Sequence, residues 1–115
     1  MMTSTAAFDQ QIPLFIRHLE VALRSGYSVK QSFEMIAQDM SAPASSEAQW
    51  VVDKWNEGKD FMQIFEDWLR RTPSRDLDLI IAAIRVQFEV QGNLADILQL
   101  LAQIMEKRTL TTSSE

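Results

Sequence analysis

The stretch LRSGYSVKQSF, residues 23–33, contains the signals that end one helix and begin the next. Gly26 stands where a residue in the left-handed conformation closes an α-helix, because glycine adopts that conformation at little cost. Ser28 and Gln31 have the spacing of a capping box, in which each residue satisfies a backbone N–H of the other. The stretch therefore predicts two helices joined by a tight turn.

Apolar residues on both sides of this turn recur three or four positions apart. They are Ile12, Phe15, Ile16, Leu19 and Leu23 before the turn, and Val29, Phe33, Ile36 and Met40 after it. This is the period of a helix with one buried face. No segment of the chain alternates with the period of a strand, so we predict an all-α fold.

Two further glycines divide the rest of the chain in the same way. Gly58 precedes a capping pattern at Asp60 and Gln63, and Gly92 precedes a capping residue at Asn93. The intervening stripes comprise Ala48, Val51, Val52 and Trp55, then Phe61, Ile64, Phe65 and Trp68, and finally Leu94, Ile97, Leu98, Leu101, Ile104 and Met105. We predict a six-helix bundle built from three antiparallel pairs hinged at Gly26, Gly58 and Gly92.

The hinge spacing leaves two interpretations open. It is compatible with a repeated helix–turn–helix unit, but the three units are dissimilar elsewhere. The preference of any short helical hairpin for glycine followed by a capping residue is therefore the favoured explanation. In both cases we expect an N-terminal extension over residues 1–10, a helical domain over 11–108 and a polar C-terminal tail over 109–115.

Composition limits the function classes. A chain of 115 residues with 46% hydrophobic and 23% charged residues has the size and balance of one folded domain, and without cysteine it has neither disulfides nor a thiolate metal site. A net charge of −5 disfavours nucleic acid as a partner. The longest apolar run, residues 79–84, is too short to span a bilayer, and the first ten residues show no secretory signal.

Two motifs together suggest a family. Residues 23–33 resemble the opening signature of the type II secretion system F domain. The stretch GNLADIL at 92–98, followed by Leu101-Ala102 and by EKR at 106–108, resembles its closing signature. The resemblance spans roughly residues 12–108 and is greatest to the tight-adherence pilus platforms. The chain departs from the family pattern at Gln91, where a second glycine is common, and at Ser32-Phe33, where Ala-Leu is favoured.

The resemblance implies a helical, cytoplasm-facing domain of a bacterial inner-membrane platform protein in type II secretion or type IV pilus assembly. Such a domain is a non-enzymatic scaffold without a cofactor. Its implied partners are a secretion or pilus assembly ATPase, other platform proteins and further copies of itself as a homodimer or higher homo-oligomer. Membrane spans flank the domain in such proteins, and we expect one after Lys107-Arg108, a basic flank typical of the cytoplasmic side. From the hinged pairs alone, a free-standing helical adaptor that binds peptides or proteins explains the sequence equally well.

The sequence contains no catalytic constellation. His18 is the only histidine, and its neighbours Arg17 and Glu20 are ordinary for an exposed helix face. The acidic pairs Glu66-Asp67 and Asp76 with Asp78 diverge around their helices, and Glu89 and Asp96 could meet only across a helix pair. We therefore predict no catalytic, cofactor-binding or metal-binding residue, and leave open an adventitious cation at Glu89 and Asp96.

The helix expected over residues 74–91 has more apolar surface than one bundle face requires. One stripe, which we expect to face the bundle, comprises Leu77, Ile80, Ile81, Ile84 and Phe88; a second comprises Leu79, Ala83, Val86 and Val90. A helix that is apolar on two sides is either central in its own domain or shared with another subunit. We predict self-association through the second stripe as a hypothesis.

A partner surface is predicted from chain direction. If consecutive helices pack antiparallel, all three hinges lie at one end of the bundle and form a mixed-charge rim. We expect this rim to face the ATPase, and its residues are Tyr27, Lys30, Glu57, Lys59, Asp60 and Asn93. Trp55, Phe61, Phe65 and Trp68 are expected in the core, whereas Trp50 lies off the stripe of its helix and is expected to be an exposed anchor.

Overall fold

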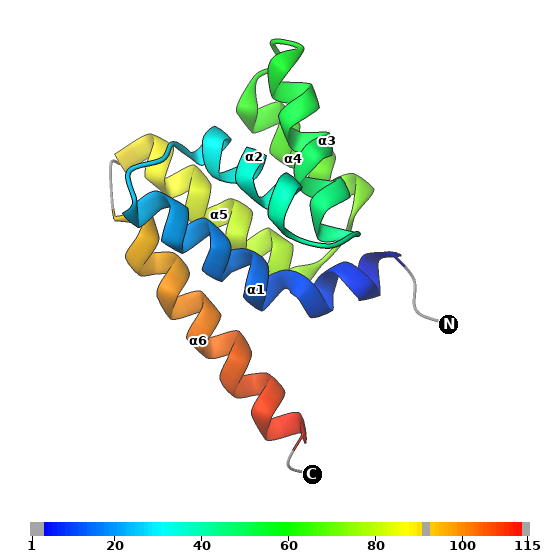
Figure 1. Ribbon diagram of the computed structural model, residues 1–115, viewed down its shortest axis with the longest axis vertical. Coiled ribbons are helices and arrows are strands. Elements are labelled where there is room, and N and C mark those ends of the chain that lie inside the picture. Colours follow the sequence, from blue (N-terminus) through cyan, green and yellow to red (C-terminus); the bar gives the residue numbers. More distant parts are fainter. Residues whose placement is uncertain (1–3, 91–92, 114–115) are drawn as a thin grey trace.

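The computed structural model describes residues 4–90 and 93–113, and within these ranges it consists of six helices joined by short turns, with no strand (Figure 1). The helices are α1 (Ser4–Arg24), α2 (Val29–Asp39), α3 (Ala44–Asn56), α4 (Phe61–Arg71), α5 (Arg75–Val90) and α6 (Leu94–Ser113). The prediction of an all-α, six-helix arrangement is confirmed.

The turns after α1 and α3 are built as their sequences predict. Gly26 and Gly58 have φ angles of 96° and 84°, in the left-handed region where a side chain would be strained. Ser28 forms the complete capping box with Gln31. Gly92 lies outside the described residues, so the third glycine hinge remains a prediction.

The most extensive packing does not follow the three predicted pairs. α1 packs chiefly along α6, and α2 packs chiefly along α3, in both cases more extensively than the helices that the glycine turns join. α1 also contacts α2, α3 and α5, so it lies at the centre of the molecule (Figure 1). Antiparallel pairing at the three glycines as the organising unit of the bundle therefore stays a prediction.

The segment expected to be an N-terminal extension belongs to the packed structure from Ser4 onward. Phe8 lies four residues before Ile12 on the same face of α1, and it is fully buried. Asp9 accepts a hydrogen bond from the hydroxyl of Ser74, which also caps α5. At the other end, the backbone of α6 continues to Ser113, beyond the expected domain end at residue 108.

Aromatic rings from α1, α2 and α4 form the centre of the core. The rings of Phe8, Phe15, Phe33 and Phe65 surround Trp68 at centroid distances of 5.7 to 6.4 Å. Edge-to-face and tilted arrangements at this distance are favourable beyond simple burial.

The remaining aromatic side chains lie at the edge of this core. Trp55 and Phe61 are partly buried against it. Trp50, expected to be exposed, is also partly buried, because the guanidinium of Arg71 lies 4.6 Å from its ring centroid and Lys54 approaches the ring at 5.8 Å.

Candidate interaction surfaces

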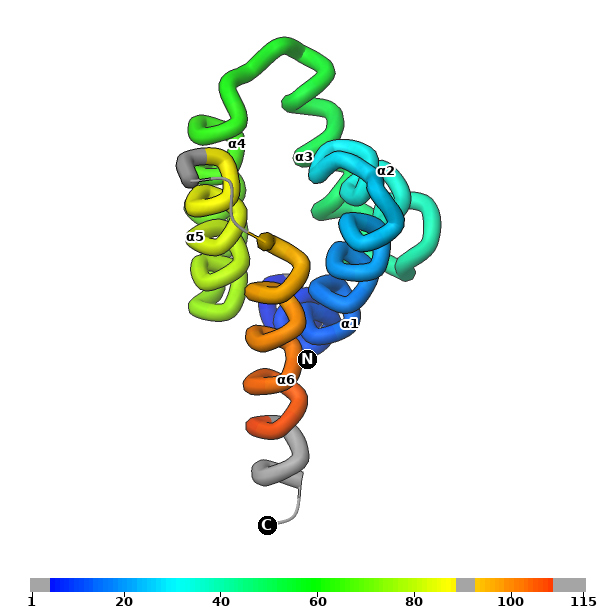
Figure 2. The backbone as a smooth tube through the Cα atoms, turned by 90° about the vertical axis from the view of Figure 1, so that its left-hand side faces the viewer, coloured from blue at the N-terminus to red at the C-terminus, as the bar shows by residue number. Residues whose placement is uncertain are grey.

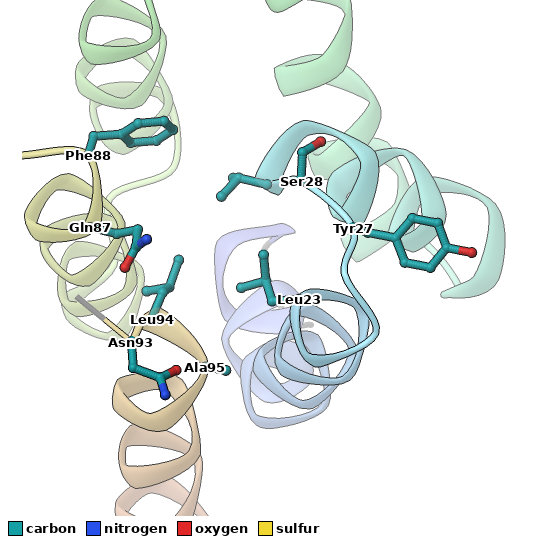
Figure 3. A pocket seen from close by; sticks show the side chains of 9 residues that line it. Leu23, Tyr27, Ser28, Gln87, Phe88, Asn93, Leu94 and Ala95 are labelled. Atoms are coloured by element: carbon teal, nitrogen blue, oxygen red, sulfur yellow. The ribbon is translucent and has the colours of Figure 1, made fainter. Parts of the chain in front are cut away.

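A hollow of about 810 Å³ lies between the α1–α2 turn and the start of α6. We call it the turn hollow. Its lining residues are Leu23, Tyr27, Ser28, Val29, Gln87, Phe88, Asn93, Leu94 and Ala95. Figure 3 shows Leu23 and Ser28 on one side, with Gln87, Phe88 and Leu94 extending toward them from the other. The surface combines apolar walls with a few polar groups.

Helix caps and one arginine hold the two walls in place. Asn93 Oδ1 accepts a hydrogen bond from the backbone N–H of Asp96, which caps α6. Arg24, at the end of α1, donates to Asp96 Oδ1 at 2.9 Å and to Gln99 Oε1 at 3.0 Å. The same arginine therefore links the helix before the first turn to the helix after the third. Asp96, considered above for an adventitious cation, is paired with this arginine, and the side chain of Glu89 lies outside the described residues.

Two side chains of α5, Phe88 and Gln87, supply an aromatic ring and a polar group to the wall of the turn hollow. Phe88 was expected to face the bundle, but its side chain is 42% exposed and packs on the ring of Phe61 at a centroid distance of 4.1 Å. The Oε1 atom of Gln87 is buried without a hydrogen-bond partner among the residues that the structure describes. An unpaired buried acceptor is uncommon, because it loses its hydrogen bonds to water.

A line of ion pairs joins α1 to α6 below the hollow. Both Nε and Nη2 of Arg17 donate to the carboxylate of Glu106, at 3.1 and 2.9 Å, and Arg17 and Arg24 both contact the buried Glu20. The hydrogen bond with Glu106 raises the pKa of Arg17, and that with Asp96 raises the pKa of Arg24. In return, the hydrogen bond from Arg17 lowers the pKa of Glu106.

The six residues predicted to form one rim are not brought together. Tyr27 and Asn93 border the turn hollow, although the ring of Tyr27 points away from the other labelled side chains (Figure 3). Lys30 lies in the first turn of α2, close in sequence to that border.

The other three members of the rim, Glu57, Lys59 and Asp60, lie at the turn between α3 and α4. Both views place this turn at the far tip of the molecule (Figures 1 and 2). The expectation that all the hinges share one end is therefore wrong for Gly58. The reason is that the α3–α4 hairpin projects away from α1 and α6 instead of lying alongside them.

The second stripe of α5 is only partly exposed. Leu79 and Val86 are each 44% exposed, whereas Ala83 between them is buried. The side chain of Val90 lies outside the described residues. Ala82 is exposed, so the accessible apolar line on this helix runs through Leu79, Ala82 and Val86.

The sequence interpretation missed an exposed apolar pair on α6. Leu100 and Ile104 are 57% and 52% exposed, although Ile104 was assigned to the core stripe of this helix. The two residues are four positions apart and share a face, which is a signal that the sequence contains. It was not recognised because neighbouring core residues give the same apolar period.

The described residues offer no assembled chemical site. His18 borders a shallow groove between α1 and α2 that is otherwise lined mainly by apolar residues such as Leu14, Val21 and Met35. Within residues 4–90 and 93–113 there is no group of three or more His, Asp or Glu side chains placed to hold a metal ion. None of the helices in this part of the chain is long and apolar enough to cross a membrane.

Comparison with known proteins gives one match. A family model described as Type II secretion system (T2SS), protein F matches residues 15–114, which include the C-terminal part of α1 and all of α2 to α6. No curated protein and no solved structure matches the chain.

Proposed function

The chain belongs to the protein F family of the type II secretion system, and we propose that it is a cytoplasm-facing scaffold that couples an assembly ATPase to the building of a pilus or pseudopilus. Members of this family are non-catalytic domains of inner-membrane platform proteins. The observation that carries the proposal is the extent of the match, residues 15–114, over the helices that build the core and the turn hollow.

We assign the partner contact to the turn hollow. Leu23, Phe88 and Leu94 supply apolar surface that a partner side chain can fill, and Gln87 supplies an amide whose oxygen lacks a hydrogen bond among the described residues. Apolar pockets with a few polar groups are the usual anchor points of protein interfaces. The mixed charges of Glu57 and Lys59, at the distant α3–α4 turn, are suited to steering a partner and not to holding it.

The experiment is a titration of the chain with an assembly ATPase from the same organism. Phe88→Ala removes the aromatic wall and should weaken binding by about tenfold or more, as for an anchor residue. The matched control is the Glu57→Lys, Lys59→Glu double variant, which should bind within about threefold of the unmodified chain, because rim charges contribute little affinity. Both variants must keep the helical circular dichroism of the unmodified chain.

Three results contradict parts of this proposal. Binding lost in the double variant but kept in Phe88→Ala would move the contact to the α3–α4 turn. If the unmodified chain does not bind the ATPase, the proposed coupling to the ATPase is wrong. Recovery of the full-length protein in the soluble fraction of the source cells, instead of the inner membrane, would favour the free-standing adaptor.

We also propose that the scaffold associates with itself, through apolar surface that includes Leu79 and Val86 on α5. Both residues are 44% exposed, so neither belongs to the buried core. Val86→Glu should therefore keep its helicity and melting temperature while light scattering shows a shift toward monomer. Loss of folding in this variant would show that the stripe belongs to the core of a single chain.

A further inference from the structure

The outer face of α6 has an ordered pattern of charge and apolar surface. Asp96, Leu100, Ile104 and Lys107 are all exposed, and their positions i, i+4, i+8 and i+11 lie on one side of a helix. An acidic residue stands at the N-terminal end of this face, two aliphatic residues stand in the middle, and a basic residue stands at the C-terminal end. We call it the α6 face.

The exposed apolar line of α5 lies next to the α6 face. Arg108 Nη2 donates to Asp76 Oδ2 at 2.6 Å, and Gln87 and Leu94 line the same hollow, so α5 and α6 run antiparallel along each other. Asp76 and Ala83 are seven residues apart and share the side of α5 that faces α6. Leu79 and Val86 flank Ala83 at the edge of that side, so they continue the apolar surface of α6.

The exposed apolar residues of the two helices lie away from the helix ends. Leu79 and Val86 are inside α5, and Leu100 and Ile104 are inside α6. On the α6 face, the charged residues Asp96 and Lys107 lie on either side of the apolar pair in sequence.

We propose that two copies of the chain pair through their α6 faces in antiparallel orientation, with Leu100 of each copy against Ile104 of the other. This inference rests on the self-association proposed above and supplies its geometry. In this pairing Asp96 of each copy lies opposite Lys107 of the other, twice in one dimer. The two-fold axis places Leu79 and Val86 of both copies on the same side of the α6 pair, where they extend the apolar contact.

Charge selects this orientation over its alternative. A parallel pair would place Asp96 against the same residue of the second copy, and likewise Lys107, and like charges brought together at an interface are strongly unfavourable. Antiparallel pairing converts both repulsions into attractions. The two-fold axis is then perpendicular to α6, so both copies keep one orientation to a membrane whose normal runs along that axis.

The test is a charge-swap mixing experiment on the 115-residue chain, measured by sedimentation equilibrium at low salt. Asp96→Lys and Lys107→Glu should each weaken self-association by about tenfold or more, because each variant places like charges opposite each other twice. An equimolar mixture should associate within about threefold of the unmodified chain, because both cross-contacts then join opposite charges. Glu66→Lys, an exposed charge reversal on α4, is the matched control and should change nothing.

The mixture also separates pairing from folding. Asp96→Lys loses the contact with Arg24, but a folding defect in one variant is not repaired by adding another chain. If neither variant weakens association, or if both do and the mixture stays as weak as its components, the antiparallel α6 pair is wrong while self-association stands. An unmodified chain that remains monomeric at high concentration would overturn both the pairing and the self-association, without touching the titration with the ATPase.

Discussion

At the residue scale, the carboxylate of Glu47 links α3 to the C-terminal end of α4. Glu47 Oε1 accepts hydrogen bonds from the indole Nε1 of Trp68 at 2.9 Å and from the hydroxyl of Thr72 at 2.7 Å, and it lies 3.6 Å from Arg71. Trp68 was correctly predicted in the core from its helical spacing. Its partner was not predictable, because 21 residues separate the two and no local pattern connects them.

Removing this acceptor should destabilise the fold. Glu47→Ala leaves the buried indole N–H and the Thr72 hydroxyl without their partner, and an unsatisfied buried donor costs about 1–3 kcal/mol. Urea unfolding should show the loss, whereas Glu66→Ala, at an exposed position, should change the free energy of unfolding by less than about 0.5 kcal/mol. Equal free energies of unfolding for the two variants would contradict a stabilising role of Glu47.

At the element scale, the contact between α1 and α6 depends on charge along one side. Arg17, Glu20, Arg24, Asp96 and Glu106 form this line of ion pairs. Their side chains are partly exposed apart from that of Glu20, so each pair adds only a modest amount to stability. As a line, they fix the position of α6 against α1, and through it the width of the turn hollow.

The ion pair between Glu106 and Arg17 makes the stability of the fold depend on pH. Its folded-state pKa lies below the ordinary value of 4.5, chiefly because of the hydrogen bond from Arg17. A lowered folded-state pKa stabilises the fold above the ordinary pKa, and this contribution disappears as the pH falls through the lowered value. The stability advantage of the unmodified chain over Glu106→Gln should therefore be larger at pH 6 than well below pH 4, as measured by urea unfolding. A difference that does not change with pH would contradict the role of this ion pair.

Local signals predicted the elements well, and relations between distant elements poorly. The capping box at Ser28 and the left-handed glycines at positions 26 and 58 depend only on nearby residues, and they occur as expected. The burial of Ala83 and the exposure of Phe88 depend on how α5 crosses α4 and α6. The helical period of apolar residues identifies an apolar face of a helix. It does not identify which element packs against that face.

At the scale of the whole molecule, the chain forms an elongated body with projections at both ends. Its principal extents are 46, 32 and 23 Å. The α3–α4 hairpin projects at one end, and α6 extends toward the other (Figure 2). The predicted common rim failed at this scale, because turn chemistry does not specify the angle between one hairpin and the next.

The central claim is that this domain binds an assembly ATPase through the turn hollow. The most direct measurement is a nuclear magnetic resonance titration of isotope-labelled chain with that ATPase, after assignment of the backbone amides. The account predicts that the shifted and broadened amides cluster at Leu23, Ser28, Gln87, Phe88 and Leu94, while those at Glu57 and Lys59 stay unchanged. Perturbation confined to the α3–α4 turn, or no perturbation at saturating ATPase, would contradict it.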